Sequence, residues 1–201
     1  TKLRCHKLAL MAASPFFEKM FTSGMKESND SEVSMSFADA ETIRSLVEYF
    51  YTGRIDINAD NALDIASASD FLLLNNLKAQ CENLLPSLVD FQNCFELRRF
   101  GKKFDIENLT STARNFILKN FREVAKTDDF KEVSEDELIE VLSDDGLNAQ
   151  NEDIVFEAVV RWVNADLEQR KPSFVKLAES IRFPFCSQEF LSTIIPSEPL
   201  M

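Results

Sequence analysis

The sequence predicts an α+β first half of about 88 residues with a small sheet, followed by an all-α second half. The chain contains only 4 Gly and 6 Pro among its 201 residues, which predicts long regular elements with short connections. Apolar and polar residues alternate in short segments of the first half, as expected for half-buried strands. From Asp90 onward the apolar residues recur at helical spacing only. We therefore expect strands only before that point.

The expected strands open the chain and then separate its first helices. Leu3 and Cys5 alternate with polar neighbours, and this segment runs directly into an expected helix over 7–13. The other two strands are expected over 33–37 and 54–57. Together these segments predict the small sheet.

The helices of the first half are bounded by residues that cap helices. Ser14 before Pro15 suits an N-cap and the first helical position, so a helix is expected over 16–22. Asp39 can cap the next helix, and Gly53 can end it. The apolar positions of that helix follow the i, i+3, i+4, i+7 spacing of one buried stripe: Ile43, Leu46, Val47 and Phe50.

Two further helices complete the first half. Asp60 is expected to cap a helix that carries Leu63 and Phe71, and Asn75-Asn76 is expected to interrupt it. The following amphipathic stretch ends at Pro86, because proline cannot continue a helix interior.

The second half is expected to contain helices only. One begins near Cys94, and a longer one is expected from Ile106 to Val124. Ser134-Glu-Asp-Glu137 has the form of a capping box, and further helices are expected after Asn151, Pro172 and Ser187. The helix that begins near Cys94 carries four basic residues, which fit a solvated face better than a nuclear-localisation signal: Arg98, Arg99, Lys102 and Lys103.

Composition argues against several functions. The net charge of −12 repels phosphate backbones, so we expect no nucleic-acid partner, and no apolar run approaches the length of a membrane helix. The only histidine is His6, and the four glycines cannot build a phosphate-binding loop, so we expect no metal, no cofactor and no enzyme activity. The four cysteines are expected to be buried thiols in a reducing compartment. That compartment would be the cytoplasm alone or the cytoplasm together with the nucleus.

Several motifs of the first half resemble the BTB (POZ) domain of the BTB-BACK-Kelch proteins. They are the run from Cys5-His-Lys to Ser-Pro-Phe-Phe-Glu-Lys-Met-Phe21, then Met25-Lys-Glu27, then Phe50-Tyr-Thr-Gly53. Motifs of the second half resemble the BACK domain of the same proteins: Ala79-Gln-Cys81, Asn93-Cys94, Asn151-Glu152, Val155-Phe-Glu-Ala158 and Trp162-Val163. The resemblance therefore covers nearly the whole chain.

The resemblance implies a BTB/POZ domain over 1–88 that lacks its N-terminal strand and helix, and a BACK domain over 89–201. It also implies a non-enzymatic substrate adaptor of a cullin-3 RING ubiquitin ligase. The BTB domain would dock the cullin and, in the full-length protein, form a homodimer, whereas a Kelch domain outside this chain would recruit a protein substrate. The alternative is a cytoskeletal, actin-associated scaffold that uses BTB only to dimerise. A BTB transcriptional repressor ranks third, because no C-x-x-C zinc motif follows the BTB-like half.

The resemblance also implies which residues bind the cullin. Met25 and Glu27 match the family's hydrophobic-x-Glu motif, although a polar loop with one incidental Met is the simpler alternative. Tyr51 matches a cullin-contacting tyrosine, and it lies about 80° from Ile43 around the helix, at the edge of the buried stripe. Its hydroxyl could therefore face a partner, or the ring could simply end the helix half-buried.

Three residues of the second half lie where the BACK domain completes the cullin-binding groove. They are Phe91, Phe95 and Leu97. The chain contains 18 Phe, so each of these positions fits the core better than a binding surface.

Overall fold

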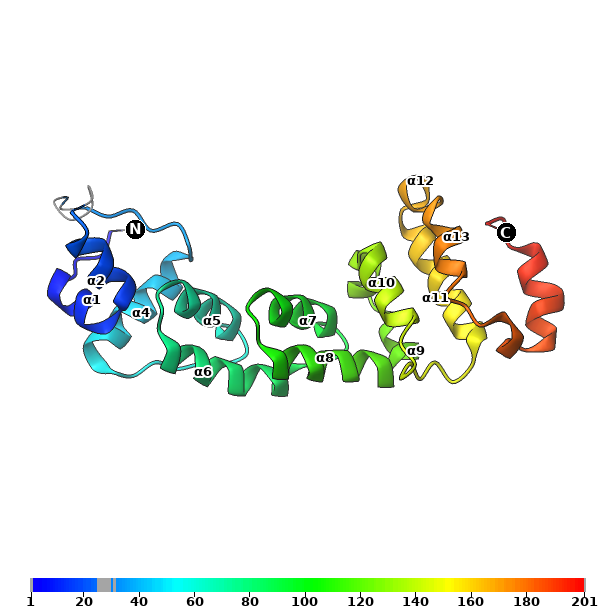
Figure 1. Ribbon diagram of the computed structural model, residues 1–201, viewed down its shortest axis with the longest axis horizontal. Coiled ribbons are helices and arrows are strands. Elements are labelled where there is room, and N and C mark those ends of the chain that lie inside the picture. The colour runs from blue at the N-terminus through cyan, green and yellow to red at the C-terminus, as the bar shows by residue number, and fades with distance from the viewer. Residues whose placement is uncertain (1, 25–29, 31, 201) are drawn as a thin grey trace. The chain divides into compact units, whose positions relative to one another are not determined.

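The computed structural model describes residues 2–24, 30 and 32–200. The chain divides into two units, which are considered separately (Figure 1). Unit 1 contains residues 1–88 and 104–108, and unit 2 contains residues 89–103 and 109–201. Segment 104–108 joins unit 1 partly through the Nζ atom of Lys78, which donates to the backbone oxygen of Phe104 at 3.1 Å.

Unit 1 consists of five α-helices and a 3₁₀ turn among the described residues. They are α1 (Lys7–Ala13), α2 (Pro15–Thr22), α4 (Ala40–Thr52), α5 (Ala62–Phe71), α6 (Asn75–Leu84) and η1 (Leu85–Leu88). The caps of α4 are confirmed. Asp39 accepts hydrogen bonds from the backbone N–H groups of Glu41 and Thr42 at 2.6 and 2.8 Å, and Gly53 ends the helix with a φ of +69°.

Other local predictions for unit 1 need correction. Ser14 is the N-cap residue of α2 and Pro15 is its first residue, as predicted, but the Ser14 hydroxyl makes no capping hydrogen bond. It donates instead to the backbone oxygen of Leu72 at 2.7 Å, in a buried position. Asn61, rather than Asp60, is the N-cap residue of α5. The break before α6 lies at Leu72–Leu74, where Leu73 has a φ of +59°, so the two asparagines begin α6 instead of interrupting a helix.

The predicted small sheet is not confirmed, because none of the described residues is in a β-strand. The alternation of burial is nevertheless present: Val33, Met35 and Phe37 are half-buried, whereas Ser34 and Ser36 are exposed. Alternation reports which face of an extended segment is covered. A strand also requires a neighbouring backbone to complete its ladder, and a pattern within one segment carries no information about that neighbour.

The half-buried side of that segment borders a cavity of about 860 Å³ within unit 1. Residues Val33, Met35 and Phe37 contribute to its lining from the extended segment. The opposite walls include apolar side chains of α1, α2 and α4: Leu10, Phe17, Leu46 and Phe50. The extended segment therefore faces the helices of the same unit.

The regular elements described in unit 2 are all helices, joined by turns and irregular segments. Its elements are α7 (Cys94–Lys103), α8 (Glu107–Lys119), α9 (Phe121–Val124), η2 (Asp129–Glu132), α10 (Glu135–Leu142), α11 (Glu152–Ala165), α12 (Leu167–Arg170), α13 (Ser173–Ala178), η3 (Phe183–Phe185), η4 (Phe190–Ile194) and η5 (Ile195–Ser197). The long helix predicted from Ile106 to Val124 is divided at Asn120 into α8 and α9.

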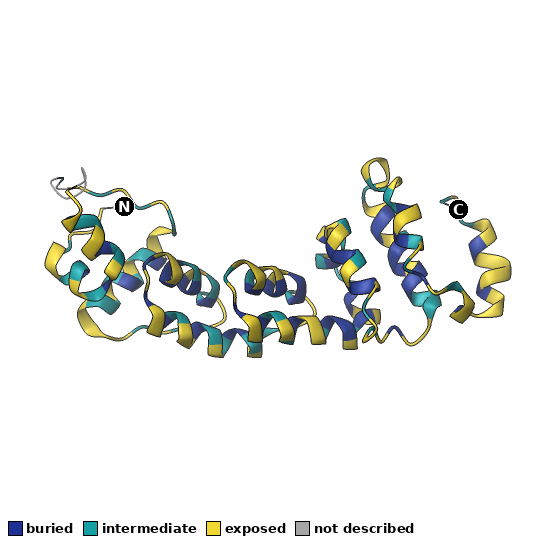
Figure 2. Ribbon diagram, viewed as in Figure 1, coloured by how far each residue is buried: buried dark blue, intermediate teal, exposed yellow. Residues whose placement is uncertain are grey.

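The Ser134 cap predicted for α10 and the start predicted for α11 after Asn151 are both confirmed. Ser134 accepts a hydrogen bond from the backbone N–H of Glu137 at 3.3 Å, and Asn151 accepts one from Ile154 at 3.1 Å. Along α11, buried positions alternate with exposed ones at helical spacing (Figure 2). A local start signal and an apolar stripe are therefore sufficient to predict both helices.

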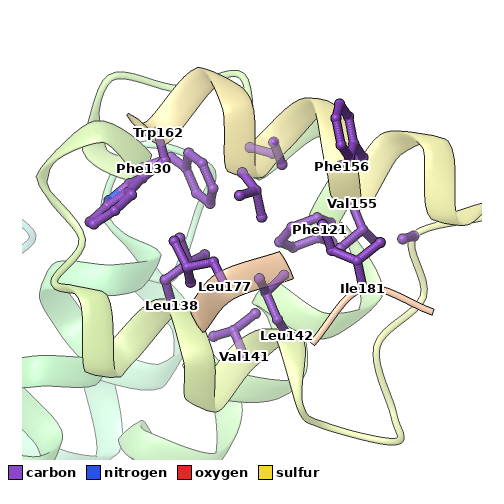
Figure 3. Packing of buried hydrophobic residues seen from close by; sticks show 14 of the residues in the cluster. Phe121, Phe130, Leu138, Val141, Leu142, Val155, Phe156, Trp162, Leu177 and Ile181 are labelled. Carbon is purple, nitrogen blue, oxygen red and sulfur yellow. The ribbon is translucent and has the colours of Figure 1, made fainter. Parts of the chain in front are cut away.

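The core of unit 2 gathers side chains from η2, α9, α10, α11 and α13 (Figure 3). Trp162 of α11 is almost fully buried there, and its Nε1 donates to the backbone oxygen of Val133 at 2.8 Å. The guanidinium of Arg170 lies 4.3 Å from the centre of the Trp162 ring. Trp162 therefore connects the core to the segment before α10.

Candidate protein-docking site

Tyr51 lies in the last turn of α4, with 50% of its surface exposed. Its hydroxyl oxygen accepts a hydrogen bond from the backbone N–H of His6 at 2.9 Å. The same oxygen lies 2.9 Å from Nδ1 of the His6 ring, and the two rings meet edge to face at 6.1 Å. The ring of Tyr51 is thus accessible, but its hydroxyl is hydrogen-bonded to His6 within unit 1. The position of Tyr51 around the helix cannot predict this partner.

Met25 and Glu27 lie outside the described residues. The described chain reaches Gly24, just after α2, and continues with Asp30 and Glu32. The assignment of these two residues to a docking motif therefore stays a prediction.

The three candidates of unit 2 differ in burial. Phe91 is 40% exposed, and its ring meets that of Phe116 at 5.0 Å between centres. It lies in a turn in which Asp90 accepts from the backbone N–H groups of the two residues that follow Phe91, at 2.8 and 3.1 Å. Short-range hydrogen bonds thus present Phe91 at the surface of unit 2.

Phe95 and Leu97 are core residues, with 0% and 3% of their surfaces exposed. Both belong to the buried side of α7, and Phe95 packs near Phe130 with ring centres 6.2 Å apart. Their burial agrees with the core alternative stated for these positions, and a direct cullin contact by either residue stays a prediction. The abundance of Phe in the chain also favours the core alternative.

Three of the four basic residues of α7 are exposed, as predicted for a solvated face: Arg99, Lys102 and Lys103. Arg98 is buried, which corrects the prediction for that residue. Arg98 is 1% exposed and pairs with Glu137 at 3.5 Å and Glu140 at 2.6 Å. Arg99 also reaches Glu137 at 3.3 Å, and Lys102 reaches Glu140 at 2.7 Å. Basic and acidic residues about 40 positions apart form one ionic network between α7 and α10, so this cluster is structural.

Three of the four cysteines are buried free thiols, as predicted. Burial raises the pKa of Cys81 and Cys186 to about 11 and that of Cys94 to about 12. Cys5 is half-buried, and burial raises its pKa as well. A raised pKa disfavours the thiolate, so these four side chains are not set up as nucleophiles.

The described part of the chain contains neither a metal-binding cluster nor a membrane-spanning helix. No group of three or more His, Cys, Asp or Glu residues there could hold a metal ion. None of the helices described is both long enough and apolar enough to cross a membrane.

Comparisons with known proteins agree with the motifs. The family model of the BTB/POZ domain matches residues 1–88, and that of the BACK domain, "BTB And C-terminal Kelch", matches residues 94–196. Curated relatives match over 200 residues, the whole of this chain. They include Kelch-like protein 7 of Rattus norvegicus at 37% identity, Kelch-like protein 21 of Danio rerio at 34% and Kelch-like protein 28 of Mus musculus at 32%.

The chain spans about one third of the length of these relatives, from 33% to 35%. A BTB match followed by a BACK match, together with relatives that match along the whole chain, determines the family. The chain belongs to the BTB-BACK Kelch-like family.

Proposed function

We propose that this chain is the cullin-docking part of a substrate adaptor for a cullin-3 RING ubiquitin ligase. The observation that carries the proposal is the exposed ring of Tyr51 at the end of α4, in a chain of the BTB-BACK Kelch-like family. Tyrosine is enriched in binding hot spots because it combines a large apolar surface with few rotatable bonds. Met25 and Glu27 would add an adaptable apolar anchor and a carboxylate.

The proposed adaptor performs no chemistry of its own. It would hold a substrate lysine near the charged ubiquitin-conjugating enzyme, so its contribution to the rate is a raised effective concentration. The BTB domain, placed over 1–88, would bind the cullin and a second copy of the protein. The BACK domain, over 89–201, would support the cullin contact through Phe91 and space a Kelch domain that recruits the substrate. We expect the protein either in the cytoplasm alone or in both the cytoplasm and the nucleus.

Isothermal titration calorimetry of this chain with the N-terminal domain of cullin-3 tests the proposal. Met25→Asp should weaken binding at least tenfold, about 1.4 kcal/mol, because a charge would replace the apolar anchor. Glu27→Ala should have a similar effect, because the partner's donor would lose its acceptor. Glu32→Ala is the matched control, since this exposed carboxylate lies close by in the sequence and pairs only with Lys2 among its described contacts.

Binding with unchanged affinity in both test variants would contradict the site, and no heat from the unmodified chain at tens of micromolar would reject the adaptor proposal. Sedimentation of the full-length protein would then decide whether it is a dimer without cullin affinity, as a cytoskeletal scaffold would be.

A further inference from the structure

The hydroxyl of Tyr51 is bound by a residue 45 positions earlier in the chain. His6 is the N-cap residue of α1, and its carbonyl oxygen accepts hydrogen bonds from the backbone N–H groups of Ala9 and Leu10 at 3.0 and 3.2 Å. His6 is thus fixed to the first turn of α1. The two hydrogen-bonding atoms that it offers to Tyr51 therefore join the start of one helix to the end of another.

This connection acts where a helix is least constrained. Tyr51 is two residues before Gly53, whose left-handed φ of +69° ends α4. The last turn of a helix has few backbone partners and frays readily, so a half-exposed side chain there would sample several rotamers. A hydroxyl held at 2.9 Å by two atoms of His6 restricts the ring to one orientation.

The hydrogen bonds also determine what the Tyr51 oxygen can offer to a partner. The oxygen accepts a hydrogen bond from the backbone N–H of His6, a donor that does not depend on the tautomer of the His6 ring. When His6 carries its proton on Nε2, Nδ1 accepts the single proton of the hydroxyl. The oxygen is then left with acceptor capacity only, so Tyr51 presents an apolar ring and no free donor.

We propose that His6 is a positioning residue that orders the Tyr51 ring for docking of a protein partner. This inference rests on the proposed function, because the partner is the cullin N-terminal domain. Ordering an exposed side chain before binding removes an entropic penalty that binding would otherwise carry. The matching surface on the partner should be an apolar side chain that packs on the ring, with at most a hydrogen-bond donor at the hydroxyl.

A double-mutant cycle with the cullin-3 N-terminal domain tests this coupling. His6→Ala removes one of the two bonds to the hydroxyl and should weaken binding about threefold, whereas Tyr51→Phe removes both and should weaken it about fivefold. The double variant should bind like Tyr51→Phe alone, because His6 acts through the hydroxyl. Additive losses, about fifteenfold in the double variant, would overturn the inference.

A second measurement reports on the ring without any partner. With selectively labelled tyrosine, side-chain relaxation in NMR should show a more mobile Tyr51 ring in His6→Ala, while Tyr49 of the same helix stays unchanged. His6→Asn, which can place an amide near the position of Nδ1, should restore both the ring order and the affinity. An unchanged Tyr51 ring would refute the positioning role, whereas an unmodified chain that fails to bind would reject the proposed function itself.

Discussion

The ionic network of α7 and α10 allows a quantitative prediction about the stability of unit 2. The network contains three cations, Arg98, Arg99 and Lys102, and of these only Arg98 is buried. The Nε atom of Arg98 has no hydrogen-bond partner among the described residues. Removing one partner of a buried pair typically costs about 3–5 kcal/mol, because the remaining charge is left uncompensated. Here each carboxylate keeps a second cation, Arg99 for Glu137 and Lys102 for Glu140.

We therefore expect Arg98→Met to lower the free energy of unfolding by about 2 kcal/mol, below that range. Methionine keeps the volume of the buried stem and also removes the unpaired Nε donor. Arg98→Ala should cost about 4 kcal/mol, because it leaves a cavity as well. Arg99→Met is the matched control: 42% of that side chain is exposed, so its loss should cost no more than about 1 kcal/mol.

Urea unfolding followed by fluorescence measures these differences in unit 2 alone, because Trp162 is the only tryptophan of the chain and lies in the core of that unit. The dependence of the unfolding free energy on urea should be the same in all variants. Equal losses for Arg98→Met and Arg99→Met would refute the distinction between buried and exposed pairs. Equal losses for Arg98→Met and Arg98→Ala would refute the cavity estimate.

Three further predictions concern the chain without a partner. Gly53→Ala should lower the stability of unit 1 by about 1 kcal/mol in thermal unfolding followed by circular dichroism, because its φ of +69° is strained for any residue with a Cβ, and a neutral effect would contradict this. Iodoacetamide at pH 8 should modify Cys5 well before the three buried thiols, as measured by peptide mass spectrometry, and equal labelling rates would contradict the burial. The unfolding free energy should also fall as the pH rises above about 9, because the folded state holds the buried thiols protonated up to a pKa of about 11 or 12. Burial raises the pKa of Glu140, but Lys102 and Arg98 lower it to a net value below 4.5. This carboxylate therefore stabilises unit 2 above that pH and loses its effect as the pH falls through its lower folded pKa. In acid unfolding followed by Trp162 fluorescence, stability should fall less steeply with pH in Arg98→Met, and an identical pH dependence would contradict the pairing.

Local chemistry is the part of this fold that the sequence predicts correctly. Asp39, Gly53 and Ser134 act on backbone groups within a few residues, so their roles follow from short patterns. Ser14 has an equally good capping pattern, yet its hydroxyl binds the oxygen of Leu72, 58 residues away. No local pattern reports on such a distant acceptor.

The same distinction explains the errors in the second half. A basic cluster and an acidic capping box are separate features of the sequence, and their pairing as Arg98 with Glu137 depends on how two helices pack. Likewise, the expected core position is found for Phe95 and Leu97 but not for Phe91, because packing leaves Phe91 40% exposed. Residue type limits the candidates, and tertiary burial selects among them.

The hydrogen-bond partners of the Tyr51 hydroxyl must be known before the effect of a Tyr51 substitution is interpreted. From the helical angle alone, its hydroxyl could contact a partner, and a loss of affinity in Tyr51→Phe would then be assigned to that contact. In the structure the hydroxyl is bound to His6, so the same loss would instead report on a less ordered ring. Tyr51→Ala removes the ring itself and should weaken binding more than Tyr51→Phe, because the apolar area presented at the surface is lost as well as the hydrogen bonds. The difference between these two substitutions separates the area that contacts the partner from the bonds that hold it in place.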